Sequence, residues 1–138
     1  MTAPEQDRVR LLLVEDEEFN RDLVRAVLSR AQDAAIAGAE LTEAPTLGDA
    51  RAALAAAEFD IVLLDVQLPD GTGLTLAAEL AERPEDQRPA IVILTAGVLP
   101  EQRAAALAAG CSTFLEKPYS PSKLIEVLRS QLPDRVPR

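Results

Sequence analysis

The sequence predicts a single α/β domain, in which a parallel sheet carries helices on both faces. Short, nearly uninterrupted runs of branched aliphatic residues recur along the chain, as expected for parallel strands that are buried on both faces. Longer segments with helical spacing separate these runs, and such alternation is typical of α/β domains. The length of 138 residues leaves no room for a second domain of useful size.

Five segments have the composition of strands. In chain order they are Val9–Val14, Ala39–Ala44, Ile61–Leu64, Ile91–Leu94 and Ser112–Glu116. The first, third and fourth are rich in branched aliphatic residues, whereas the second and fifth are weaker candidates. A polar loop with two prolines, Glu82–Pro89, is expected to be a surface connection within the domain.

Five helices are predicted between and after these strands. In order, they cover the segment around Phe19, Leu23 and Val27, then Ala50–Ala57, Leu74–Ala81, Glu101–Ala109 and the segment that starts at Pro121. The first has apolar residues at four-residue steps, and the last has an apolar stripe from Leu124 to Leu128. Thr46 resembles a capping residue for the second helix, while Pro100 and Gly110 suit the two ends of the fourth.

The composition excludes several classes of function. The chain has no His, which removes Ser-His-Asp triads, His-ligated zinc and a phosphohistidine carrier role. Its single Cys excludes an internal disulfide and a Cys-cluster metal site. A net charge of −9 argues against direct nucleic-acid binding. With neither a membrane-spanning run nor a signal peptide in the sequence, we expect a cytoplasmic location and no membrane insertion.

Polar side chains follow the predicted strands at the edge where ligands bind in sheets of this kind. These residues are Glu15, Asp16, Asp65, Thr95 and Lys117. Any one of them alone fits a solvated loop residue, but the set at successive strand ends indicates a site. Clustered carboxylates repel one another, and a divalent cation such as Mg²⁺, which prefers oxygen ligands, relieves that repulsion.

The same residues suit phosphoryl transfer. A carboxylate beside Mg²⁺ can attack phosphorus and form an acyl phosphate, and Asp65 lies at the end of the most apolar strand. Catalysis of this kind is mainly positioning and neutralisation of charge. Lys117 would supply the compact positive charge opposite the metal, and the Thr95 hydroxyl would hydrogen-bond the added group.

Four motifs together resemble the receiver domain of two-component response regulators. They are Leu12-Leu13-Val14-Glu15-Asp16, the segment from Leu64 to Leu74 (LDVQLPDGTGL), Leu94-Thr95-Ala96 and Lys117-Pro118. The resemblance covers about residues 8–132 and implies a doubly wound, five-stranded sheet with the flavodoxin-like strand order 2-1-3-4-5. Residues 1–7 and 133–138 are then expected to be flexible tails.

The resemblance also implies a role for each site residue. Asp65 would be the phosphoacceptor, taking its phosphoryl group from a sensor histidine kinase or a phosphotransfer protein. The implied Mg²⁺ ligands are Glu15, Asp16, Asp65 and the backbone carbonyl of Gln67. Lys117 would pair with the phosphoryl group, and its peptide bond to Pro118 is expected to be cis. Thr95 and Phe114 match the hydroxyl and the aromatic residue of the family's conformational switch.

The sequence departs from the common family pattern near the metal. Glu15 stands where many members have Asp, and we expect its longer side chain to reach the ion through a water molecule. Gly97, two residues past Thr95, has no side chain, so together with Gln67 it should leave the phosphoryl site open. In this family the positions of Gln67 and Gly97 tune the lifetime of the acyl phosphate.

Phosphorylation is expected to change a surface that contacts a downstream protein. By the resemblance it comprises the fourth helix, the fifth strand and the fifth helix, roughly Val98–Leu107, Ser112–Glu116 and Pro121–Leu132. The last helix is also a candidate face for homodimer formation on activation. Since the chain ends soon after this helix, we expect either a stand-alone receiver domain, which works through protein contacts or as a phosphorelay shuttle, or a part of a larger regulator or hybrid kinase. The Met at the start favours the stand-alone form.

Three other functions compete with this interpretation. A haloacid-dehalogenase-type phosphatase would need a second Asp two residues after Asp65, where this chain has Gln67. A dinucleotide-binding domain would need a further glycine at Leu76, and no Walker A lysine loop exists. A pseudo-receiver, which binds partners without accepting phosphate, is disfavoured by the complete set of acidic residues, Thr95 and Lys117.

Overall fold

The computed structural model describes residues 8–97 and 99–134, so Val98 and the predicted tail residues 1–7 and 135–138 lie outside the described part of the chain. The elements are, in order, β1 (Arg10–Val14), α1 (Glu18–Ser29), α2 (Ala34–Ala37), β2 (Glu40–Ala44), α3 (Leu47–Ala56), β3 (Ile61–Asp65), β4 (Gln67–Leu68), β5 (Gly71–Thr72), α4 (Gly73–Ala81), a 3-10 helix (Glu85–Gln87), β6 (Ala90–Thr95), α5 (Pro100–Ala108), β7 (Thr113–Glu116) and α6 (Pro121–Ser130).

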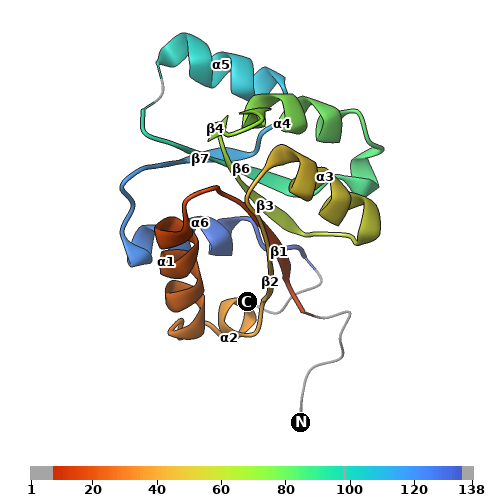
Figure 1. The fold of residues 1–138 in the computed structure, drawn as a ribbon. Coiled ribbons are helices and arrows are strands. Elements are labelled where there is room, and N and C mark those ends of the chain that lie inside the picture. The colour runs from red at the N-terminus through yellow and green to blue at the C-terminus, as the bar shows by residue number, and fades with distance from the viewer. Residues whose placement is uncertain (1–7, 98, 135–138) are drawn as a thin grey trace.

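Five parallel strands form the main sheet in the order β2-β1-β3-β6-β7. Counted along the chain, these five strands have the order 2-1-3-4-5, which confirms the predicted topology (Figure 1). From β2 the chain returns past β1 to begin β3 on its other side, so the direction of winding reverses between β1 and β3. Such a reversal opens a crevice beyond the carboxyl ends of the two strands.

The sheet separates two hydrophobic cores, because successive side chains of a strand point to opposite faces. Leu11 and Leu13 of β1 pack in one core with residues of α1, α2 and α6. Leu12 and Val14 pack in the other core with residues of α3, α4 and α5. Figure 1 shows these two groups of helices on opposite sides of the sheet. Burial on both faces explains why the strands are continuous apolar runs.

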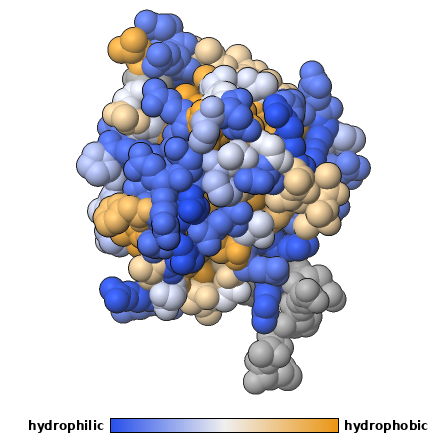
Figure 2. Space-filling view, in the orientation of Figure 1, coloured by the Kyte–Doolittle hydropathy of each residue, from blue (hydrophilic) through white to orange (hydrophobic). Residues whose placement is uncertain are grey.

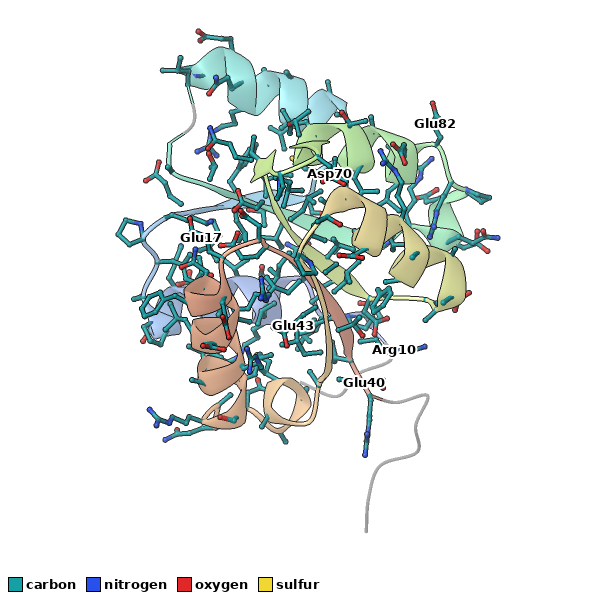
Figure 3. All side chains as sticks on the ribbon, viewed as in Figure 1. Arg10, Glu17, Glu40, Glu43, Asp70 and Glu82 are labelled. Atoms are coloured by element: carbon teal, nitrogen blue, oxygen red, sulfur yellow. The ribbon has the colours of Figure 1, made fainter. Side chains whose placement is uncertain are left out.

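Several short elements were not predicted. α2 is a single turn, and Asp33 caps it by accepting hydrogen bonds from the backbone of Ala35 and Ile36. β4 and β5 form a two-residue antiparallel hairpin. Asp70 lies in the turn of that hairpin and accepts hydrogen bonds from the amides of Leu47 and Gly48 at 2.9 and 3.0 Å, at the N-terminus of α3 (Figure 3). Elements this short bury too few apolar residues to leave a periodic pattern.

The predicted apolar stripe of α1 was wrong at its first residue. Phe19 is 76% exposed, whereas Val24, Val27 and Leu28 provide the buried face of α1. Phe19 belongs to the first turn, next to the exposed residues that join β1 to the helix. The four-residue spacing of Phe19, Leu23 and Val27 is therefore real, but only its later members contact the core.

The surface seen in Figure 2 is mainly hydrophilic, with small, separate hydrophobic areas. This agrees with the burial of nearly all large apolar side chains in the two cores; the large hydrophobic residues that stay exposed in the described part are Phe19, Leu99 and Leu107. Within residues 8–97 and 99–134, no helix has the length and apolar character needed to cross a bilayer.

Candidate functional site

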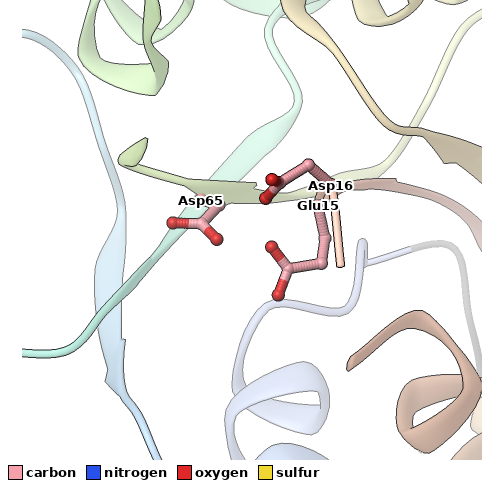
Figure 4. Close-up of side chains that lie close together, drawn as sticks. All are labelled: Glu15, Asp16 and Asp65. Carbon is pink, nitrogen blue, oxygen red and sulfur yellow. The ribbon is translucent and has the colours of Figure 1, made fainter. Parts of the chain in front are cut away.

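Three acidic side chains meet at the carboxyl ends of the central strands. β1 leads into Glu15 and Asp16, and β3 ends on Asp65. Each of the three offers a carboxylate oxygen, and these oxygens lie within 4.8 Å of one another (Figure 4). Thr95, at the end of β6, and Lys117, just after β7, line the same cleft as Asp16 and Asp65. The structure thus brings together all five residues expected at the strand ends.

Lys117 is the cation of this cluster. Its Nζ lies 2.7 Å from Asp65 Oδ2 and 2.8 Å from Glu15 Oε1. The backbone N–H of Lys117 donates to the carbonyl of Thr95 at 2.7 Å, and the Lys117–Pro118 peptide bond is cis. The Lys117 side chain is 23% exposed and that of Glu15 only 1%, so the pair lies largely out of water, where charges interact more strongly.

Burial and mutual contact shift the pKa values of the three groups. The pKa of Glu15 is raised to about 7, chiefly by burial and next by its interaction with Asp65. Burial also acts to raise the pKa of Asp65, but its interaction with Glu15 and hydrogen bonds from Lys117 and the Gln67 amide hold that pKa below its usual value. Burial acts to lower the pKa of Lys117, but its two carboxylate partners raise it. Near neutral pH, Asp65 and Lys117 are therefore charged, and Glu15 titrates.

In magnesium-free buffer, Glu15 is expected to make the protein less stable as the pH rises. Its pKa of about 7 in the folded state exceeds the ordinary value of 4.5, so its stabilising contribution is complete below about pH 4.5 and is lost as the pH passes through 7. Glu15→Gln stays neutral and should remove this part of the slope. Urea unfolding in EDTA between about pH 5 and pH 8 measures it, with the exposed Glu18→Gln as control. An equal slope in wild type and Glu15→Gln would contradict the prediction.

The cluster has the features of a divalent cation site. Glu15 Oε2 is buried and finds no hydrogen-bond partner among the described residues, which costs free energy unless an ion or water completes its coordination. Carboxylate oxygens from Asp16 and Asp65 complete a set of hard donors that suits Mg²⁺. Asp16 is exposed, which leaves access for the waters that Mg²⁺ retains, and the Gln67 amide donates to Asp65 Oδ1 at 3.1 Å. The donor set therefore fits the ion.

The two predicted switch residues line the same cleft. The Thr95 hydroxyl donates to the carbonyl of Gly97 at 3.0 Å and accepts from its amide at 3.3 Å, so it is bonded within its own loop. A side chain at Gly97 would meet no heavy atom within 4 Å, which agrees with an open site. Phe114 of β7 is half-buried, and the guanidinium carbon of Arg103 in α5 lies 4.6 Å from its ring centroid.

Comparison with known proteins assigns the family. Residues 11–129 match the family model of the response regulator receiver domain. The chain belongs to this family. Receiver domains are the signalling domains of two-component systems and not classical enzymes. The match therefore favours a receiver domain over the phosphatase and dinucleotide-binding alternatives. The glycines Gly71 and Gly73, considered for a dinucleotide-binding loop, belong to β5 and to the start of α4.

Receiver domains similar to this one occur in proteins of different kinds. This chain is 38% identical over 125 residues to the aerobic respiration control sensor protein ArcB of Escherichia coli K12. The matched region covers 88% of this chain but only 15% of ArcB. The structure of the chemotaxis protein CheY4 of Vibrio cholerae has a TM-score of 0.78 at 29% identity and covers 91% of this chain and 99% of that one. The receiver domain of the Pseudomonas aeruginosa sensor histidine kinase PA1611, with a magnesium ion in its active-site cleft, has a TM-score of 0.75 at 27% identity and covers 90% and 97%.

The sequence reasoning missed two residues around the acidic loop of the receiver domain. Asn20 Nδ2 donates to Glu15 Oε1 at 2.6 Å, and Arg21 Nη1 donates to backbone carbonyls of the loop. Neither residue lies at a strand end or in one of the four motifs, so neither was expected at the site. The signal that was available is their position on the first two turns of the helix that follows the acidic pair.

Proposed function

We propose that this receiver domain accepts a phosphoryl group onto Asp65, with Mg²⁺ bound beside it, and thereby controls a partner protein. The donor is the phosphohistidine of a sensor histidine kinase or a phosphotransfer protein. The observation that carries the proposal is the placement of Asp65 at the open end of a buried strand, 2.7 Å from Lys117 Nζ and within 4.8 Å of two further carboxylates.

Asp65 is suited to act as the nucleophile. Its pKa lies below the usual value, so the carboxylate is ionised near neutral pH, and the Gln67 amide helps to orient it. In the transfer, a carboxylate oxygen bonds to phosphorus while the phosphorus–nitrogen bond breaks, and the electron pair of that bond stays on the imidazole. The product is an acyl phosphate. Glu15, Asp16, Asp65 and the Gln67 carbonyl would hold Mg²⁺, which when bound would supply positive charge to the phosphoryl oxygens.

Lys117 and Thr95 would respond to the new group. Before transfer, Lys117 neutralises Asp65 and Glu15. After transfer, its ammonium would pair with a phosphoryl oxygen. The Thr95 hydroxyl, which hydrogen-bonds Gly97 before transfer, then turns to the phosphoryl group, and Phe114 moves inward behind it. These two arrangements of Thr95 and Phe114 are states in equilibrium. A ligand shifts an equilibrium only as far as it interacts more favourably with one state, and the phosphoryl group would act in this way.

The surface that reads this change comprises α5, β7 and α6. Leu99 and Leu107, at and within α5, are 57% and 49% exposed, which suits a protein contact. Arg103 connects α5 to Phe114 of β7, so movement of the ring is transmitted to the helix. The α6 face is also the candidate for homodimer formation on activation.

Incubation with Mg²⁺ and acetyl phosphate is expected to add a single phosphoryl group, detected by intact mass. EDTA should prevent the addition, and hydroxylamine should remove the adduct because it cleaves acyl phosphates. Backbone amide resonances of α5, β7 and α6 should shift in the phosphorylated sample. No adduct in a folded sample, with a phosphoramidate donor failing as well, would contradict phosphoryl transfer and favour the pseudo-receiver alternative. An adduct with unchanged resonances would contradict the proposed surface.

A further inference from the structure

Arg21, on the second turn of α1, reaches back to the loop that carries the acidic pair. Its Nη1 donates to the backbone carbonyls of Glu15 and Asp16, both at 2.9 Å. β1 ends at Val14 and the N-cap of α1 is Glu17, so these two carbonyls belong neither to the sheet ladder nor to the helix. A charge-assisted donor to both carbonyls therefore holds the backbone between the two elements.

The guanidinium is itself held from the other side by β2. Arg21 Nε lies 3.4 Å from Oε1 of Glu43, and the Arg21 side chain is only 17% exposed. Arg25 Nε lies 3.2 Å from the second oxygen of the same carboxylate and is 49% exposed. Figure 3 shows Glu43 beside α1. The planar guanidinium thus connects β2 to the acidic loop in one fixed orientation.

We infer that Arg21 is a positioning residue for the divalent cation, an inference that rests on the proposed function. It fixes the backbone of Glu15 and Asp16, so the two carboxylates face Asp65 before the ion arrives. This matters most for Asp16, because its exposed side chain takes its direction from the backbone. Groups that orient metal ligands from the second layer typically contribute 10- to 100-fold to metal affinity.

A positioning role for Arg21 and simple electrostatics predict opposite changes in Mg²⁺ affinity when Arg21 is replaced by a neutral residue. Arg21 is a cation next to a cation site, so its charge alone repels Mg²⁺, and removal of the charge would tighten binding. Loss of the two hydrogen bonds would instead loosen the loop and weaken binding. Arg25 provides a matched control, since it carries the same charge and shares Glu43 but is paired with Asp22 and Glu43 instead of the loop carbonyls.

Calorimetric titration of the whole chain with Mg²⁺ tests the inference. Arg21→Met should raise the dissociation constant about tenfold, at the low end of the second-layer range. Arg21→Lys keeps the charge but is shorter and offers one donor group, so its affinity should lie between wild type and Arg21→Met. Arg25→Met should stay within about twofold of wild type, since pairs this exposed contribute little. Unchanged or tighter binding by Arg21→Met, when wild type binds the ion, would overturn the inference.

A second readout requires no metal. In EDTA, the backbone amide of Glu15, which donates to the carbonyl of Ala44, should exchange hydrogen faster in Arg21→Met than in wild type or Arg25→Met. The unfolding free energies from urea melts should identify any global loss of stability, which would speed exchange throughout the protein. Unchanged local exchange in Arg21→Met would also overturn the positioning role. Failure of wild type to bind Mg²⁺ would contradict the proposed function, while the exchange measurement would still decide the role of Arg21.

Discussion

Asp65→Asn is expected to abolish the phosphoryl adduct formed with acetyl phosphate and Mg²⁺. The amide has no ionised oxygen to attack phosphorus, so the rate should fall at least about a hundredfold, and removal of a nucleophile from an optimised enzyme costs up to about 10⁶-fold. Asn has nearly the shape of Asp, so it can still accept the hydrogen bond from the Gln67 amide. Lys117 also keeps Glu15 as a partner. The fold should therefore survive, and near-wild-type circular dichroism would confirm this.

Glu17→Gln is the matched control for Asp65→Asn. Glu17 lines the same cleft and is exposed, but it lies outside the group of three converging carboxylates. Intact mass should show the same adduct in Glu17→Gln as in wild type. An adduct that persists in Asp65→Asn, with its sensitivity to EDTA retained, would mean that another side chain is the acceptor. Peptide mapping of the adduct would then locate that side chain.

Gly73→Ala adds a single methyl group but is expected to cause a large loss of stability. A Cβ at Gly73 would lie 2.1 Å from the backbone oxygen of Asp65 and 3.0 Å from Cγ of Leu64. The Gly73 amide also donates to the carbonyl of Val66 at 2.8 Å, so α4 begins directly against the end of β3. Relief of the clash must move either the helix or the strand. The expected loss is about 3 kcal/mol, measured by urea unfolding.

The same change should slow phosphoryl uptake, because the clash falls on the backbone of Asp65 itself. Gly97→Ala is the matched control for the stability measurement, since its new methyl group would meet no heavy atom within 4 Å. Its unfolding free energy should stay within about 0.5 kcal/mol of wild type. Equal stability of Gly73→Ala and Gly97→Ala would contradict the close approach of α4 to β3.

Much of the fold could be predicted because its main elements have strong and simple patterns. Strands buried on both faces must be apolar at every position, so Ile61–Leu64 and the other central strands stand out in the sequence. Each predicted strand lies within one residue of the observed one at either end. Because parallel strands end at a common edge, the convergence of Asp65, Thr95 and Lys117 could also be predicted from strand positions alone.

The rest depends on contacts that leave no periodic signal. Phe19 fits an apolar stripe by spacing, but it is exposed in the first turn of α1, next to the exposed residues that join β1 to the helix. Asp70 caps α3 from a position 22 residues away from Gly48, and Arg21 bonds backbone oxygens instead of a side chain that a motif could reveal. Such contacts are set by tertiary placement, which local composition does not encode.

The pairing of Lys117 with Glu15 joins residues 102 positions apart. On the ribosome, the acidic residues after β1 and β3 emerge well before the strand that delivers the ammonium. Until β7 docks at the edge of the sheet, the carboxylates lack the lysine that neutralises them, and the cleft lacks one wall. A chain clipped ahead of residue 113 would keep Glu15 and Asp65 but lose the ammonium that pairs with them and the Phe114 side of the cleft. The cluster of charges is thus complete only when the last strand has joined the sheet.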